Sequence, residues 1–180
     1  MTLTIGLIVN PVAGMGGSVG LKGTDGDMYE KALELGAEPV TPQRTLTFLD
    51  HLETQHDVKL VTAPGAMGAD LAAGLGIPTH VLGEIGEQTQ PQDTKRIARL
   101  MMDHGVDLLI FVGGDGTARD IVDAVGTDLP VVAVPAGVKM YSGVFAVNPG
   151  AAAQMVEGFL EGAELIEEEV LDIDEDSFRE

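Results

Sequence analysis

The feature that most constrains the fold is an uninterrupted apolar run that leads directly into a glycine-rich turn. Residues 106–112 are Val-Asp-Leu-Leu-Ile-Phe-Val, and residues 113–117 follow as Gly-Gly-Asp-Gly-Thr. A short apolar run bounded by glycines predicts a strand that is buried on both faces, as in a parallel sheet. Residues 117–125 have a helical pattern, so the chain is expected to pass from strand to helix at this turn.

The same alternation of strand and helix patterns extends along the chain. Further strands are expected at residues 3–9, 58–62, 78–82 and 129–134. Further helices are expected at residues 27–36, 45–55, 66–75, 95–104 and 150–162. Thr94 is a candidate cap for the helix at 95–104. This alternation predicts an α/β domain of three layers, in which helices cover both faces of a mostly parallel sheet.

One long connection, residues 83–93, is rich in Gly, Gln and Pro. Two interpretations remain open for it. It is either a plain surface connection or a mobile flap beside the functional site, since loops at the site end of α/β sheets often carry function.

The glycine-rich turn is the strongest candidate for binding chemistry. Gly113, Gly114 and Gly116 would let phosphate oxygens approach backbone amides without collision with a Cβ atom. The start of the following helix adds its own amides and the positive end of its dipole. Asp115 is placed to hold a divalent cation or to accept a proton from a hydroxyl, and Thr117 to cap the helix or bind phosphate. The alternative is a plain strand–turn–helix in which Asp115 caps the helix.

A second glycine-rich segment, residues 10–26, follows the first strand. Because parallel strands end at the same edge of a sheet, this segment is expected beside the turn at 113–117. Lys22 is either a phosphate contact or a solvated side chain of a flexible loop. Lys139, after the last strand, either meets the ligand or pairs with a surface carboxylate. The candidate phosphate-binding residues of these segments are Asn10, Gly14, Gly16, Gly17, Lys22 and Lys139.

The charge of the chain limits its partners. It has 29 Asp and Glu against 10 Lys and Arg, a formal net charge of −19. This field repels nucleic acid and anionic membranes, so neither is an expected partner, and a nucleotide would need a metal ion or amide dipoles to screen its phosphates. The absence of Cys excludes disulfides and thiolate chemistry and fits a cytoplasmic location. No apolar run approaches the ~20 residues that cross a bilayer.

Four separate blocks resemble a family of kinases. Their sequences are Asn-Pro-Val-Ala-Gly-Met-Gly-Gly at 10–17, Val-Gly-Leu-Lys-Gly-Thr-Asp-Gly at 19–26, Gly-Asp-Gly-Thr-Ala-Arg-Asp-Ile at 114–121 and Pro-Ala-Gly-Val-Lys-Met at 135–140. The turn at 113–117 resembles the signature of NAD kinases, diacylglycerol and sphingosine kinases, and 6-phosphofructokinases. Together the blocks resemble the ATP-NAD kinase family, in the branch that includes the acetoin-catabolism AcoX proteins. Lipid kinases usually have Asn-Glu where this chain has Arg119-Asp120, and phosphofructokinases usually have Ser where it has Thr117.

The resemblance implies an organisation and an activity. Residues 1–163 would form an NAD kinase/phosphofructokinase-like nucleotide-binding domain, and residues 164–180 an acidic tail or linker toward a C-terminal β domain that is absent from this chain. The full-length enzyme would transfer a phosphoryl group from ATP or polyphosphate to the ribose 2′-hydroxyl of NAD, which is the step of NADP biosynthesis. Mg²⁺ would bridge the donor phosphates, and Asp115 would orient or deprotonate the hydroxyl or hold the metal ion.

Three further expectations depend on the same resemblance. Related enzymes assemble into dimers and tetramers, so a homo-oligomer is expected for the full-length form. A non-catalytic nucleotide-binding or regulatory module is one alternative function. An AcoX-type kinase of another small hydroxyl substrate is the other.

Overall fold

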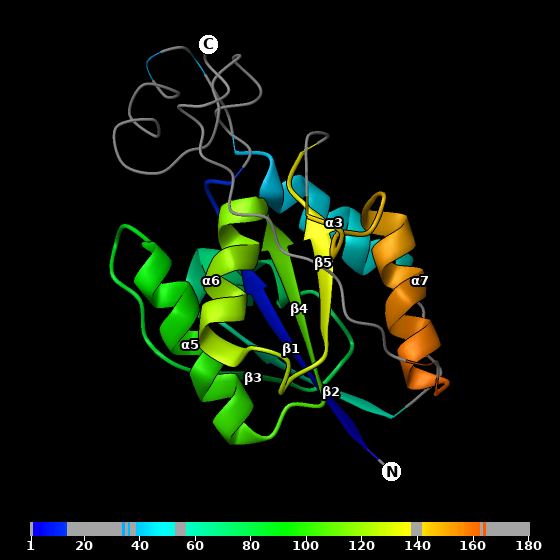
Figure 1. Ribbon diagram of the computed structural model, residues 1–180. Coiled ribbons are helices and arrows are strands. Elements are labelled where there is room, and N and C mark those ends of the chain that lie inside the picture. The colour runs from blue at the N-terminus through cyan, green and yellow to red at the C-terminus, as the bar shows by residue number, and fades with distance from the viewer. Residues whose placement is uncertain are drawn as a thin grey trace.

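The computed structural model describes residues 2–13, 34, 36, 39–52, 57–137, 142–162 and 164. Within them, five strands form one sheet in the order β3-β2-β1-β4-β5, and every neighbouring pair is parallel (Figure 1). The strands are β1 (Leu3–Val9), β2 (Val58–Thr62), β3 (Thr79–Val81), β4 (Leu108–Gly113) and β5 (Val131–Pro135). The helices are α3 (Thr41–His51), the 3-10 turn η1 (Gly65–Met67), α4 (Ala69–Ala72), α5 (Pro91–His104), α6 (Asp115–Val125) and α7 (Pro149–Leu160).

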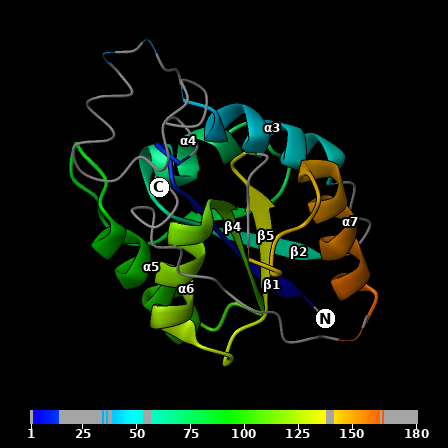
Figure 2. The same ribbon diagram turned by 45° about the horizontal axis from the view of Figure 1, so that its top comes forward.

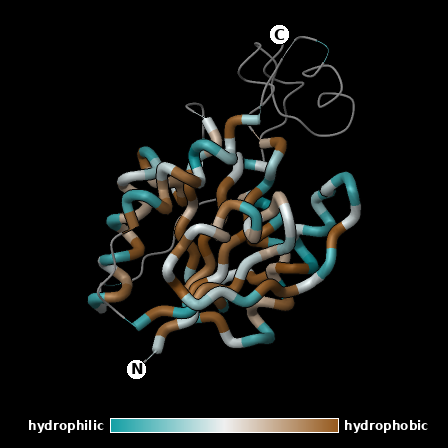
Figure 3. The backbone as a smooth tube through the Cα atoms, turned by 180° about the vertical axis from the view of Figure 1, so that it is seen from behind, coloured by the Kyte–Doolittle hydropathy of each residue, from teal (hydrophilic) through white to brown (hydrophobic). Residues whose placement is uncertain are grey.

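Helices cover both faces of this sheet, which confirms the expected three-layer α/β domain. In Figures 1 and 2, α5 and α6 lie on one face of the sheet, and α3 and α7 lie on the other. Ile97 of α5 and Ile121 of α6 join the core on the face of Phe111, whereas Phe48 of α3 and Val156 of α7 join the opposite core. Figure 3 shows the hydrophobic stretches gathered in the middle of the molecule, where the strands run.

Strand β4 lies between β1 and β5 in the described sheet, and all six of its residues are buried. Val112 of β4 pairs with Val9 of β1, and Gly113 pairs with Pro135 of β5. The chain therefore leaves β1, β4 and β5 at one edge of the sheet. This confirms the prediction that the three glycine-marked exits share an edge.

Helix α3 begins earlier than the spacing of its leucines suggested. Pro42 occupies its first turn, and the buried face includes Thr41, Thr45 and Phe48 rather than Leu46, which is 40% exposed. The two threonines tolerate burial because the Thr45 hydroxyl donates to the Thr41 carbonyl at 2.7 Å and the Thr41 hydroxyl donates to the Asn10 carbonyl at 2.8 Å. The expected helix at 45–55 is thus shifted toward the N-terminus.

The single helix expected at 66–75 is wrong, because the structure divides this segment at Gly68 into η1 and α4. Gly68 has a φ of 156°, a conformation that side chains disfavour. A Cβ atom there would also lie 3.3 Å from the carbonyl oxygens of Ala63 and Leu7. The glycine thus lets the chain turn tightly against the ends of β1 and β2.

Gly68→Ala is expected to lower the free energy of unfolding by about 1–3 kcal/mol, because alanine must adopt a strained φ in a crowded position. Urea denaturation measures the change. Gly76→Ala is the matched control, because a Cβ atom at Gly76 meets nothing within 4 Å. Equal unfolding free energies for the two variants would contradict this account of the turn.

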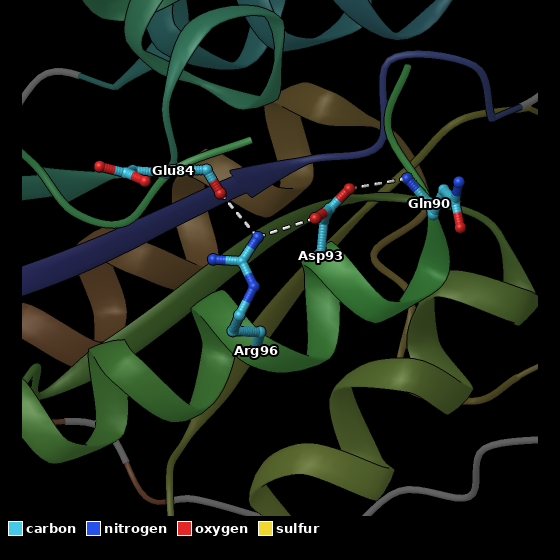
Figure 4. Close-up of polar contacts among 4 residues, drawn as sticks. All are labelled: Glu84, Gln90, Asp93 and Arg96. Carbon is cyan, nitrogen blue, oxygen red and sulfur yellow. Dashed lines mark hydrogen bonds and ion pairs between the residues drawn. The ribbon is translucent and has the colours of Figure 1, made fainter. Parts of the chain in front are cut away.

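Helix α5 begins at Pro91, four residues before the expected start. Gln90 is the N-cap, and its backbone amide donates to the Asp93 carboxylate at 2.9 Å to complete a capping box (Figure 4). Thr94 is buried inside the first turns, so its assignment as the cap is wrong. The helix ends at Gly105, as expected, where φ is 94°.

The connection at 83–93 is tied to α5 near both of its ends. Arg96 donates to the Glu84 carbonyl oxygen at 2.6 Å and to the Asp93 carboxylate at 2.7 Å (Figure 4). Ile85 packs against the core on the α5 face of the sheet. These contacts favour the interpretation as a structured surface connection, and the flap stays a hypothesis.

Several sequence-based expectations lie outside the described residues. They are the helix at 27–36, apart from Glu34 and Gly36, and the acidic tail at 164–180, apart from Glu164. In the part of the chain that the structure describes, no helix has the length and apolar character needed to cross a bilayer.

Candidate phosphate-binding site

The strand order places a topological switch point between β1 and β4, and we call the region at the carboxyl ends of these two strands the crevice. From β1 the chain adds β2 and β3 on one side, and then β4 and β5 on the other side. The loops that leave β1 and β4 therefore diverge at their carboxyl ends, which is where open α/β sheets bind ligands. Asn10 follows β1 and Gly114 follows β4, so two of the sequence-predicted segments flank this switch point.

Asn10 links the loop after β1 to the first turn of α6. Its backbone amide donates to the Val112 carbonyl at 2.9 Å. Its side-chain amide donates to the Thr117 hydroxyl at 3.0 Å, and its side-chain oxygen accepts from the Val12 amide at 3.1 Å. Asn10 thus links the loop after β1 to β4 and to the first turn of α6.

Gly113 is required by packing at the end of β4. A Cβ atom at this position would lie 2.5 Å from the Cβ atom of Thr117, closer than real side chains approach. Thr117 is the third residue of α6 and is only 4% exposed, with its hydroxyl bonded to Asn10. The first glycine of the turn therefore lets the first turn of α6 press directly onto the strand.

Helix α6 begins two residues before the expected start, at Asp115, with Gly114 as its N-cap. No side-chain hydrogen bond caps it among the described residues. The two capping alternatives, by Asp115 and by Thr117, are therefore wrong. The first-turn amides of such a helix and its dipole together favour a bound anion at this edge of the sheet.

The Asp115 carboxylate is held by a residue that the sequence did not single out. Ser142 donates to Asp115 Oδ1 twice, from its backbone amide at 2.8 Å and from its hydroxyl at 2.5 Å. Ser142 follows β5 in the chain and is 5% exposed. Ser142 comes three residues after Lys139, beyond the same strand, so the shared edge of parallel strands is the sequence signal that could have indicated it.

The structure gathers six of the sequence-predicted site residues at the crevice, namely Asn10, Gly113, Gly114, Asp115, Gly116 and Thr117. The others lie outside the described residues, namely Gly14, Gly16, Gly17, Lys22 and Lys139. The roles of all these residues in phosphate binding stay predictions.

Arg119 and Asp120, the pair that departs from the lipid-kinase pattern, belong to ion pairs on the α5 side of α6. Arg119 Nε lies 3.3 Å from Asp123 Oδ1. Lys95 of α5 lies 3.3 Å from Asp123 Oδ2 and 3.9 Å from Asp120 Oδ1. These charges join the two helices.

The Asp115 carboxylate suits Mg²⁺ that is bound together with a nucleotide. Among the described residues, no group of three or more His, Asp or Glu is arranged to hold a metal ion. Mg²⁺ at phosphoryl-transfer sites usually takes one or two carboxylates and completes its coordination with water and substrate phosphates. Asp115 fits that mode, and it does not form a metal cage of protein side chains.

A shallow hollow of about 340 Å³ lies at the opposite edge of the sheet. Its lining includes Lys59, His80 and His104, with the two imidazole rings stacked at 5.7 Å. His104 ends α5 and Lys59 lies near the amino end of β2, so the hollow is far from the carboxyl ends of the strands. It offers positive charge but no strand-end turn and no helix start, so the crevice stays the candidate for phosphate binding.

The fold and the glycine-rich turn at the switch point define the class of α/β domains that bind nucleotides or phosphate groups. Within that class, the chain belongs to the ATP-NAD kinase family, because residues 5–164 match the ATP-NAD kinase N-terminal domain. This confirms the family, while the AcoX branch stays a hypothesis. A comparison with curated proteins finds no match.

Among solved structures, the chain is similar to a diacylglycerol kinase from Bacillus anthracis str. Sterne. The two share 22% sequence identity with a TM-score of 0.43. The alignment covers 87% of this chain and 42% of that kinase. The chain therefore spans less than half the length of the enzyme it resembles.

Proposed function

We propose that this chain is the nucleotide-binding domain of an NAD kinase-type phosphotransferase. The full-length protein would transfer a phosphoryl group from ATP or polyphosphate to the 2′-hydroxyl of NAD, in the cytoplasm and as a homo-oligomer. The observation that carries the proposal is the position of Asp115, which begins α6 at the switch point of a kinase-family domain. A carboxylate fixed beside a phosphate-binding helix start is the arrangement that hydroxyl phosphorylation needs.

Phosphoryl transfer depends mainly on positioning and on neutralising charge. In this proposal, the donor phosphates lie against the turn at Gly114 and Gly116, where the amides of α6 and its dipole stabilise negative charge. Bound Mg²⁺ supplies additional positive charge at the phosphates. Asp115 orients the acceptor hydroxyl and takes its proton, while Asn10 keeps the β1 loop and the first turn of α6 together.

The remaining predicted contacts belong to the loops after β1 and β5. Gly14, Gly16, Gly17 and Lys22 would extend the phosphate cradle from the β1 side, and Lys139 would add a cation from the β5 side. Positive charge from these loops would offset the repulsion between a polyanionic donor and a chain of net charge −19.

Coupled detection of NADP tests the function directly. Full-length protein is incubated with NAD, Mg²⁺ and either ATP or polyphosphate, and NADP is measured with a specific dehydrogenase. The assay is run in low and in molar KCl, because salt screens the repulsion between the nucleotide and a chain of net charge −19. We expect NADP formation that requires both donor and Mg²⁺. If the protein binds the donor and phosphorylates another small hydroxyl compound without forming NADP, that compound and not NAD is the acceptor. Donor binding without any transfer would favour the regulatory module.

A further inference from the structure

We propose that Ser142 is a positioning residue for Asp115, and that it sets the direction in which the Asp115 carboxylate faces the acceptor hydroxyl. The inference rests on the proposed function, in which Asp115 handles that hydroxyl. It adds a residue that the glycine-rich signature does not contain. Ser142 lies 27 positions from Asp115 in sequence, and the two meet only through the fold.

The contact between Ser142 and Asp115 is short and doubled. The amide and the hydroxyl of Ser142 both donate to Oδ1 of Asp115, at 2.8 Å and 2.5 Å. One carboxylate oxygen offers two in-plane lone pairs, and two donors on the same oxygen fix the plane of the group as well as its position. The direction of the second oxygen, Oδ2, then follows from Ser142.

Ser142 is itself held by a segment that folds back along β5. The Ala146 amide donates to the Ala133 carbonyl at 3.1 Å, and Phe145 forms a parallel bridge with Ala133. The ring of Phe145 packs edge-on against Phe111 of β4, with centroids 5.8 Å apart. These contacts anchor the residues just after Ser142 to β4 and β5, and they thereby help to hold Ser142 beside the carboxylate.

Such a support matters because hydroxyl phosphorylation is sensitive to geometry. Asp115 is the first residue of α6, and loss of the Ser142 hydroxyl removes one of the two hydrogen bonds from Ser142 that orient its carboxylate at the helix start. A small misplacement of a reacting group costs up to about 10²-fold in rate without weakening the binding of the donor. Ser142 should therefore influence turnover more than it influences nucleotide affinity.

The test compares Ser142→Ala, Ser142→Thr and the control Thr79→Ala, which removes a hydroxyl that bonds the Ile77 carbonyl at the opposite edge of the sheet. Turnover of the full-length protein is measured with the acceptor that it phosphorylates. The rate is divided by the concentration of protein that binds nucleotide. We expect Ser142→Ala to lower kcat by about 10-fold or more with the nucleotide KM nearly unchanged. Ser142→Thr, which keeps both donors, should recover most of the loss, and Thr79→Ala should match wild type.

A double-mutant cycle separates positioning from general destabilisation. If Ser142 acts through Asp115, the double variant Ser142→Ala/Asp115→Asn should have nearly the same kcat as Asp115→Asn alone. Unchanged kcat in Ser142→Ala, or a full additional loss in the double variant, would overturn the inference. Unchanged turnover in Asp115→Asn alone would instead defeat the proposed function, so the two failures are distinguishable.

Discussion

Asp115→Asn is expected to lower the turnover of the full-length protein by about 10²–10⁴-fold, the usual contribution of a general base. Asparagine keeps the shape of the side chain, and its oxygen can still accept both hydrogen bonds from Ser142. The loss would therefore come from the missing charge and basicity, and not from a displaced helix. Steady-state kinetics, together with a thermal melt, measure the effect.

Asp115→Asn is expected to change nucleotide affinity in the opposite direction to turnover. A carboxylate beside phosphate groups is repulsive, so Asp115→Asn should bind metal-free nucleotide at least as tightly as wild type. Asp128→Asn is the control, because it removes the same charge at a position away from the crevice. Asp128 is an exposed residue in the loop after α6. If Asp115→Asn retains wild-type turnover while folded, the catalytic assignment is wrong.

The second large effect is a contrast between two adjacent glycines. Gly113→Ala is expected to lower the free energy of unfolding by about 3 kcal/mol, since its Cβ atom would collide with Thr117 in a well-packed site. Gly114 has φ −111° and ψ −166°, which an alanine adopts without strain. Gly114→Ala should therefore cost about 1 kcal/mol or less, the usual loss when an N-cap becomes alanine.

The order of the two variants reverses when nucleotide affinity is measured. At Gly114 the added methyl group would occupy the space through which phosphate reaches the amides, and affinity should fall by about 10-fold or more. Calorimetric titration and urea denaturation of both variants test the contrast. If Gly114→Ala binds nucleotide normally, the cradle does not lie where we place it.

Buried parallel strands were the predictable part of this fold. Strands β1 and β4 have both faces covered by helices, so each is a continuous apolar run that is visible in the sequence. Glycines at their exits marked the turns. Because parallel strands end together, the sequence was enough to place Asn10 and the turn at 113–117 at one edge.

The missed features depend on contacts that no local pattern encodes. Thr41 and Thr45 are polar residues whose burial is possible only through hydrogen bonds seen in the folded chain. Gly68 divides a helical pattern because its φ of 156° and the nearby carbonyl oxygens of Leu7 and Ala63 disfavour a side chain there. Ser142 reaches Asp115 only after β5 and the segment that folds back along it are in place. Each of these features was set by tertiary packing, which overrides local propensity.

We propose that the crevice between β1 and β4 binds the phosphates of the donor. A titration of isotope-labelled protein with Mg·ATP in molar KCl, followed through backbone amide resonances, tests it most directly. We expect the largest changes in amide chemical shift at Asn10, at residues 113–117 and at Ser142. We expect these changes to be smaller in Gly114→Ala at the same nucleotide concentration. Shifts concentrated at Lys59, His80 and His104, in the hollow at the opposite edge, would contradict it.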